Sequence, residues 1–240
     1  LAPGGSWDVR QVVAVRGDGS DAAGRAADEL ENGAGSVMLD LRHADTIDTD
    51  LLERVLEGVV LDAAAVGLRA GPRAVQAAEA LRALWADLGV GDVAALASLG
   101  ADPVGEHAAS GGVRGPVGEA LAAVAALAAD VSRRHPHVRT ITVDAALYHD
   151  AGASEAEQLG VALATGVEYL RALESAGLDA AAGAAQLEFR LAAGAQQFLT
   201  IGAFRASRRL SARVGEVTCG GGLLSAGSSV LPMKRLNTRQ

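Results

Sequence analysis

The segment Arg139–Val214 reads RTITVDAALYHDAGASEAEQLGVALATGVEYLRALESAGLDAAAGAAQLEFRLAAGAQQFLTIGAFRASRRLSARV, and it decides the fold class. Short apolar runs alternate in it with longer, alanine-rich stretches of helical period. Ser154, with Glu157 three residues later, forms a capping box that marks the start of a helix. Apolar residues then recur at helical spacing, and Gly177 follows as a stop signal. These apolar residues are Leu159, Leu163, Val167, Leu170 and Leu173. The segment therefore predicts the alternating units of an α/β protein.

The same alternation continues toward the N-terminus. The sequence predicts strands at Val9–Val15, Ser36–Leu41, Asp62–Leu68, Ala97–Ala101, Thr140–Asp144 and Glu188–Ala192. It predicts helices at Ala22–Glu31, Asp50–Gly58, Arg73–Leu88, Pro116–Arg134, Ser154–Ser175, Ala180–Gln186 and Gln196–Val214. These strands are too few to close an eight-stranded barrel. The pattern alone therefore leaves open whether the chain is part of a barrel or an open sheet.

The end of the chain differs from the rest. Residues 1–215 carry the β–α alternation, whereas residues 216–240 are rich in Gly and Ser and have no clear period. We interpret residues 1–215 as one domain, which the family resemblance given below implies to be a partial barrel. The stretch 216–240 is expected to be either a truncated or frame-shifted end or a flexible terminal linker.

Composition excludes several classes of function. The net charge of −8 disfavours nucleic acid as a partner. The single cysteine, Cys219, cannot form an internal disulfide or a cysteine-type metal site, so a reducing, cytoplasmic compartment is expected. We find no apolar run long enough to cross a membrane and expect no membrane association. His135 and His137 flank a proline without a third ligand at suitable spacing, so a solvated loop is favoured there over a metal site.

Candidate chemistry lies where strands end, because functional groups of parallel barrels sit at the carboxyl ends of their strands. Asp102 follows the strand Ala97–Ala101, and Tyr148, His149 and Asp150 follow Thr140–Asp144. These three neighbours have the chemistry for acid–base catalysis, although a histidine that only holds the shape of a loop is an equal alternative.

Four arginines lie three to four residues apart on the last predicted helix, at Arg205, Arg208, Arg209 and Arg213. They have the chemistry to bind phosphate groups. A helix stripe that faces solvent or another subunit is the favoured interpretation.

Several of these motifs together resemble the methylmalonyl-CoA mutase family, and most of all its small, non-catalytic subunit. They are Asp150-Ala151-Gly152-Ala153, Phe198-Leu199-Thr200-Ile201, Arg205-Ala206-Ser207-Arg208, Ser98-Leu99-Gly100-Ala101-Asp102-Pro103, Glu31-Asn32-Gly33 and Trp7-Asp8-Val9-Arg10-Gln11. The resemblance implies an incomplete (β/α)8 TIM-type barrel with about five to six β–α units. It also implies adenosylcobalamin-dependent isomerisation of methylmalonyl-CoA and succinyl-CoA, in which the cofactor supplies the radical.

The resemblance also implies a lost substrate site. The catalytic subunit carries Gly-Tyr-His-Met-Gln-Glu-Ala-Gly-Ala after its fourth strand, and an ungapped alignment puts its catalytic histidine on Leu147 and the preceding tyrosine on Ala146. Its substrate-binding glutamine falls on Gly100, and its carboxylate-binding arginine falls near Ser110. No catalytic residue is therefore expected in this chain, and Asp102, Tyr148 and His149 are only weak candidates for a substrate pocket.

The resemblance implies a small subunit that stabilises a catalytic large subunit. The cobalamin-binding motif Asp-x-His-x-x-Gly is absent from the sequence, so the cofactor is expected on the partner or on a domain outside this chain. Two alternatives stay open. One is an active acyl-CoA mutase that uses Tyr148 and His149, and the other is a stand-alone acyl-CoA-binding module.

Overall fold

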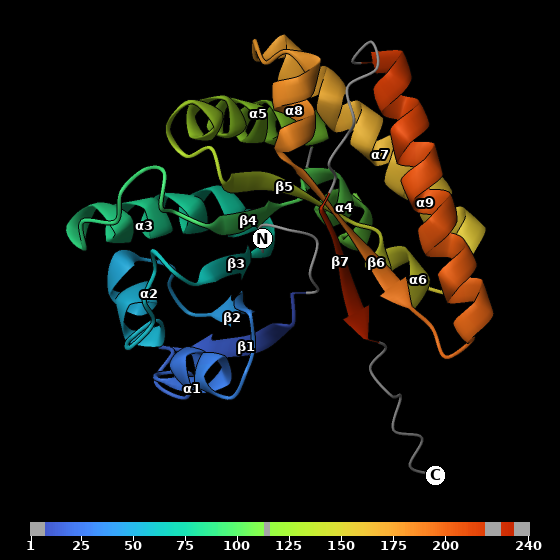
Figure 1. Cartoon of the computed structure of the whole chain (residues 1–240). Coiled ribbons are helices and arrows are strands. Elements are labelled where there is room, and N and C mark those ends of the chain that lie inside the picture. The colour runs from blue at the N-terminus through green and yellow to red at the C-terminus, as the bar shows by residue number, and fades with distance from the viewer. Residues whose placement is uncertain (1–7, 113–115, 219–226, 233–240) are drawn as a thin grey trace. The chain divides into compact units, whose positions relative to one another are not determined.

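A computed structural model describes residues 8–112, 116–218 and 227–232 of the chain. The chain divides into two compact units, Leu1–Thr142 and Val143–Gln240. The elements of the first unit are β1 (Arg10–Gly17), α1 (Arg25–Glu31), β2 (Ser36–Ala44), α2 (Thr49–Val55), β3 (Ala65–Arg69), the 3-10 turn η1 (Gly71–Arg73), α3 (Ala74–Asp87), β4 (Ala97–Ala101), α4 (Pro103–Ala109) and α5 (Val117–Arg134) (Figure 1). Strand β5 (Val138–Asp144) begins in this unit and ends in the next. The second unit holds α6 (Ala146–Asp150), α7 (Glu155–Ser175), α8 (Ala180–Ala185), β6 (Leu187–Ala193), α9 (Gln197–Thr218) and β7 (Gly227–Pro232).

The strands are parallel, and their order in the sheet follows their order in the chain. In the first unit β1 pairs with β2, β2 with β3, β3 with β4 and β4 with β5. In the second unit β6 pairs with β7, also in parallel. A doubly wound sheet reverses its strand order at a switch point, whereas a (β/α)8 barrel adds each new strand beside the last. The α/β class and the partial barrel are thus confirmed.

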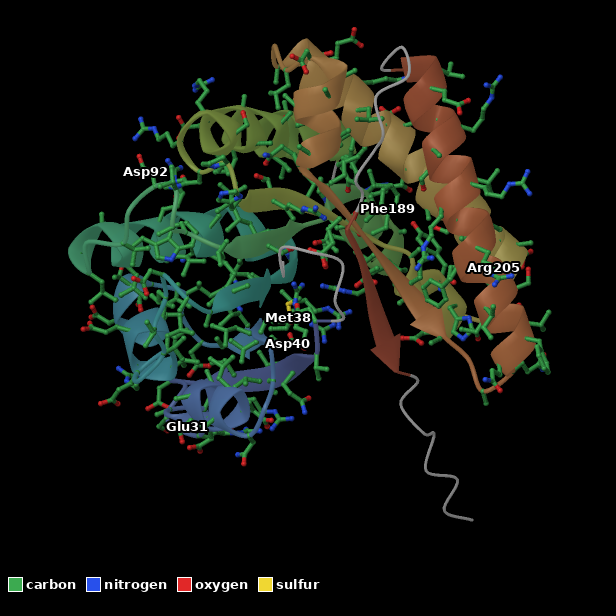
Figure 2. The ribbon with its side chains drawn as sticks, viewed as in Figure 1. Glu31, Met38, Asp40, Asp92, Phe189 and Arg205 are labelled. Atoms are coloured by element: carbon green, nitrogen blue, oxygen red, sulfur yellow. The ribbon has the colours of Figure 1, made fainter. Side chains whose placement is uncertain are left out.

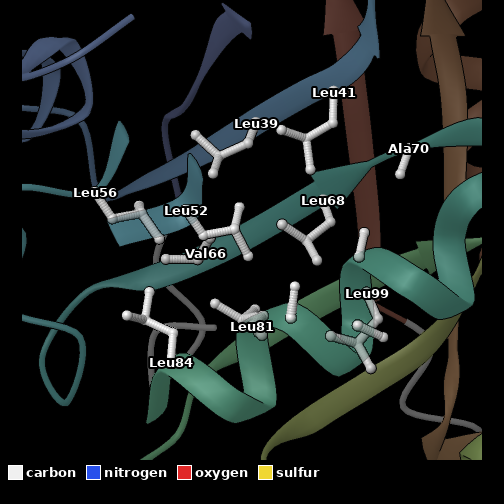
Figure 3. Packing of buried hydrophobic residues seen from close by; sticks show 14 of the residues in the cluster. Leu39, Leu41, Leu52, Leu56, Val66, Leu68, Ala70, Leu81, Leu84 and Leu99 are labelled. Atoms are coloured by element: carbon white, nitrogen blue, oxygen red, sulfur yellow. The ribbon is translucent and has the colours of Figure 1, made fainter. Parts of the chain in front are cut away.

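The core of the first unit lies between its strands and the helices that cover them. Leu39 and Leu41 of β2 and Leu68 of β3 are fully or almost fully buried, and they face Leu81 and Leu84 of α3 (Figure 3). Leu81 and Leu84 are three residues apart on one face of α3, which is the spacing that turns an apolar stripe toward a sheet. The core of this unit is thus built mainly from aliphatic side chains, in keeping with a sequence of which only 3% is aromatic.

Arg73 fixes the carboxyl end of β2 to the turn that follows β3. Its guanidinium donates hydrogen bonds to the carbonyl oxygens of Leu41 at 3.0 Å and Ala44 at 2.9 Å.

On β2, Asp40 accepts two hydrogen bonds from the Arg42 guanidinium, at 2.8 and 2.7 Å. Burial acts to raise the pKa of Asp40, but the bonds from Arg42 outweigh it and hold that pKa below its usual range.

The second unit is organised by α7, whose predicted capping box is confirmed. The backbone N–H of Ser154 donates to the Glu157 carboxylate at 2.8 Å, and the Glu157 N–H donates to the Ser154 hydroxyl at 3.4 Å. The hydrogen bond from the Ser154 backbone lowers the pKa of Glu157. Tyr169 and Leu173, on the same helix, are fully buried. The helix therefore starts where the sequence predicts. Of the predicted apolar stripe, Leu159 and Leu173 are buried, whereas Leu163, Val167 and Leu170 are only half-buried.

Gly166 lets α7 approach β6 closely. A Cβ atom at Gly166 would lie 2.9 Å from Cζ of Phe189, whereas one at Gly160 on the same helix would meet nothing within 4 Å. We expect Gly166→Ala to be less stable than Gly160→Ala by about 1–3 kcal/mol, because both gain helix propensity and only the first overpacks the core. Urea unfolding followed by circular dichroism measures the difference. Equal urea midpoints and slopes for the two variants would show that Phe189 moves aside without a loss of stability.

The structure differs from the sequence-based elements in a few places. α1 begins at Arg25 instead of Ala22, and β3 begins at Ala65 instead of Asp62. Helices α4 and α6 were not predicted, and neither was β7, which lies within the stretch 216–240. The division at residue 216 and its interpretation as a truncated end or a linker stay predictions, and much of that stretch lies outside the described residues.

Over the part of the chain that the structure describes, no helix is long and apolar enough to span a membrane.

Candidate functional site

Asp102 lies at the carboxyl end of β4, where it caps α4. Its carboxylate accepts a hydrogen bond from the Gly105 N–H at 3.0 Å, and the residue is buried. It also lines a cavity of about 280 Å³ on the helical side of the sheet. The other residues around this cavity that carry polar groups are Glu106 and His107, and most of the rest are apolar residues of α3, α4 and α5. The capping bond gives Asp102 a structural role, and the cavity has room for a small ligand only.

Gly100, two residues earlier, has a backbone that excludes any side chain. Its φ angle is +69°, and a Cβ atom there would lie 1.9 Å from the carbonyl oxygen of Leu68 on β3. The pairing of β4 with β5 shifts its register between Ser98 and Ala101, so Gly100 sits in a local irregularity of the strand. Glutamine, which the resemblance puts at this position in the catalytic subunit, does not fit this backbone.

In the second unit, Tyr148 and His149 lie on the short helix α6 and not in a loop, which corrects the loop interpretation. Both are half-buried, and so is Leu147, whereas Asp150 is exposed. Nδ1 of His149 is buried and has no hydrogen-bond partner among the described residues. Residues two apart on an α-helix point about 200° apart, so His149 and Leu147 face different sides of α6. His149 is therefore not placed where a side chain at position 147 would act.

A buried ion pair lies directly before α6, and sequence reasoning missed it. Asp144 at the end of β5 accepts a hydrogen bond from the Arg190 guanidinium of β6 at 2.9 Å, and their side chains are 11% and 4% exposed. The Ala145 N–H donates to the carbonyl of Arg190 at 3.0 Å. The sequence contained one signal for the pair, since each charged residue falls inside a predicted strand. Because each charge neutralises the other inside the second unit, the pair has a structural role between β5 and β6.

The predicted site residues thus fall into two groups. Tyr148 and His149 are neighbours on α6 in the second unit, and Asp102 belongs to the first unit. Among the residues that the structure describes, no group of three or more His, Cys, Asp and Glu side chains is arranged to hold a metal ion. The absence of a catalytic metal stays a prediction.

His135 corrects one further interpretation. It is 7% exposed, its ring lies 5.4 Å from that of Trp85, and its Nδ1 is 3.3 Å from the carbonyl oxygen of Asp92. The solvated-loop interpretation is therefore wrong for His135 and holds only for His137, which is exposed. His135 is a packed residue of the first unit.

Parallel strands in chain order, each followed by a covering helix, define this chain as part of a β–α barrel protein. The sequence profile described as methylmalonyl-CoA mutase matches residues 44–221. The chain belongs to the methylmalonyl-CoA mutase family.

Curated relatives refine this assignment. The methylmalonyl-CoA mutase small subunit of Streptomyces virginiae is 50% identical over 216 residues, which are 90% of this chain and 34% of that protein. The small subunit of Propionibacterium freudenreichii subsp. shermanii is 35% identical over 88% of this chain and 32% of its own length. The large subunit of Streptomyces virginiae is 39% identical over 83 residues, which are 35% of this chain. The chain spans about a third of the length of the small subunits that it matches.

Proposed function

We propose that this chain is the barrel portion of a methylmalonyl-CoA mutase small subunit, and that it stabilises a catalytic large subunit without carrying out chemistry itself. The complex would isomerise methylmalonyl-CoA and succinyl-CoA. The observation that carries the proposal is the backbone of Gly100, which leaves no space for a substrate-binding side chain. Leu147, at the position of the family's catalytic histidine, supports it, because an aliphatic side chain cannot donate a hydrogen bond to a thioester carbonyl.

The cofactor of the family is adenosylcobalamin, and the residues of this chain do not fit it. None of the five histidines is preceded two residues earlier by aspartate, as the cobalamin motif requires. Of these histidines, His135 is packed against Trp85, and Leu147 stands two residues before His149. This chain therefore has no proposed catalytic step that uses the cofactor. We propose that adenosylcobalamin binds to the large subunit or to a domain outside the sequence.

One observation favours the second candidate function, an active acyl-CoA mutase. The buried Nδ1 of His149 has no hydrogen-bond partner among the described residues, and Tyr148 lies next to it on α6. A buried polar atom of this kind is uncommon unless a ligand or water satisfies it. In this function His149 would donate a proton or a hydrogen bond to the acyl group.

An activity assay separates the two. We expect the purified chain with adenosylcobalamin to convert no methylmalonyl-CoA, and we expect His149→Ala to leave the activity of a complex with the large subunit unchanged. If His149 is a proton donor instead, the chain alone turns over acyl-CoA and the substitution lowers the rate by about 10²–10⁴-fold. Either turnover by the chain alone or such a loss would overturn the scaffold proposal.

A further inference from the structure

One side of helix α9 is exposed although it carries large apolar and charged groups. We call it the α9 outer face, and its residues are Phe198, Ile201, Arg205, Arg208, Arg209 and Arg213. Phe198 is 87% exposed and Ile201 43%. At 3.6 residues per turn, all six side chains fall within about 140° of the helix circumference. They form one continuous strip and not scattered surface residues.

The other side of α9 packs within the second unit. Ser211 and Gly215 are buried, and Phe204 and Ser207 are half-buried. The helix also contacts α7, and Figure 1 shows the two helices running side by side. The orientation of α9 is therefore set by packing on one side, which leaves the outer face available.

The α9 outer face is positively charged on a chain with a net charge of −8. Arg213 forms an ion pair with Glu216 at 2.7 Å. Within the described residues, Arg205, Arg208 and Arg209 have no ion pair. Figure 2 shows Arg205 on the side of α9 that points away from the rest of the second unit. The α9 outer face thus carries three arginines that have no carboxylate partner among the described residues.

A shallow, open hollow borders the strip. Arg209 and Arg213 of the strip line it together with Ala206, Leu210, Ala212 and Glu216. Leu210 is 43% exposed. Arginine and aromatic residues are the types enriched in the centres of protein interfaces, and Phe198 and Ile201 add exposed apolar area to the same strip as the arginines.

From this face we infer a docking surface for an acidic protein surface, which the large subunit supplies; the inference rests on the proposed function. The partner would offer an apolar pocket for Phe198. It would also carry carboxylates about 10–22 Å further along the helix axis, opposite Arg205 to Arg213. A second copy docked through the same face fits less well, because its four arginines would lie opposite four arginines and Glu216 beside them is already paired with Arg213.

The test measures binding of the chain to the Streptomyces virginiae large subunit by surface plasmon resonance, with that organism's own small subunit as the positive control. We expect Phe198→Asp to weaken binding about 30-fold or more, as for a central interface residue. The double substitution Arg205→Glu/Arg209→Glu should slow association and change its salt dependence. Val93→Asp, at a residue 70% exposed in the first unit, and Arg25→Glu on α1 are the matched controls, and both should bind as wild type.

The possible outcomes distinguish a failure of the docking surface from a failure of the scaffold proposal. If the wild-type chain binds and the α9 variants bind equally well, the docking surface is wrong while the scaffold proposal stands. If the positive control binds and the wild-type chain does not, the scaffold proposal fails and takes the docking surface with it. Self-association that the α9 variants abolish would also overturn the inference, since it would make a second copy the occupant. Unchanged circular dichroism of each variant excludes unfolding as the cause of a loss.

Discussion

Gly100→Ala is expected to destabilise the first unit by about 3–5 kcal/mol, which is enough to unfold a marginally stable domain. Two costs combine. The φ angle of +69° is strained for any residue with a Cβ atom, and that atom would lie 1.9 Å from the Leu68 carbonyl oxygen. The clash is with backbone of the neighbouring strand, so no rotation of a side chain relieves it.

Gly89→Ala is the matched control for this experiment. Gly89 has a φ angle of +70°, nearly the same as Gly100, but a Cβ atom there meets nothing within 4 Å. The control therefore shares the backbone strain and lacks the clash, and it should cost about 1–2 kcal/mol. Unfolding is followed by the fluorescence of Trp85, which is buried in the first unit. If both variants lose the same stability, the local backbone of β4 differs from the one described.

Arg190→Met is expected to destabilise the second unit by about 3–5 kcal/mol. The substitution removes the guanidinium that lies 2.9 Å from Asp144 and leaves that carboxylate in the protein interior. The double variant Asp144→Leu/Arg190→Met removes both charges and should regain most of the loss, because buried ion pairs are often replaceable by apolar residues of similar volume. Denaturant unfolding of the single and double variants forms a thermodynamic cycle.

The outcome of this cycle decides the role of the pair. If the double variant is as unstable as Arg190→Met, the two side chains make stabilising interactions beyond neutralising each other's charge. If the single variant costs nothing, the pair is accessible to water in solution. Both results would contradict the view that the pair serves only to neutralise two buried charges on β5 and β6.

The regular elements were predictable where the periodic signal was long. α7 is the clearest case, because its capping box marks its start and its apolar residues recur at helical spacing. Its buried face was predicted only in part, since small and polar residues such as Gly166 and Thr165 lie in it. α4 and α6 were missed because each is short and begins two residues after a strand ends, where the sequence analysis expected a strand end followed by a loop. β7 was missed because its sequence, GSSVLP, lies in a Gly- and Ser-rich stretch with weak strand propensity. The pairing with β6, which is a tertiary effect, decides that strand.

The candidate site was less predictable than the fold. The resemblance identified Leu147 and Gly100 as positions of interest, but only the structure gives the reason why Gly100 excludes a side chain. Asp144 and Arg190 are far apart in the sequence, so their ion pair depends on the pairing of distant strands. The spacing of Arg205 to Arg213 on one helix face was visible in the sequence, whereas the exposure of Phe198 beside them was not.

The central claim is that this chain acts as a scaffold for a catalytic large subunit, and size-exclusion chromatography with light scattering and a mutase assay tests it most directly. The chain is mixed with the Streptomyces virginiae large subunit and adenosylcobalamin, beside that organism's small subunit as the positive control. We expect a one-to-one complex in which the large subunit is more active or more stable than alone. If the chain elutes separately while the control forms its complex, or if the large subunit is soluble and fully active without it, the scaffold account is contradicted.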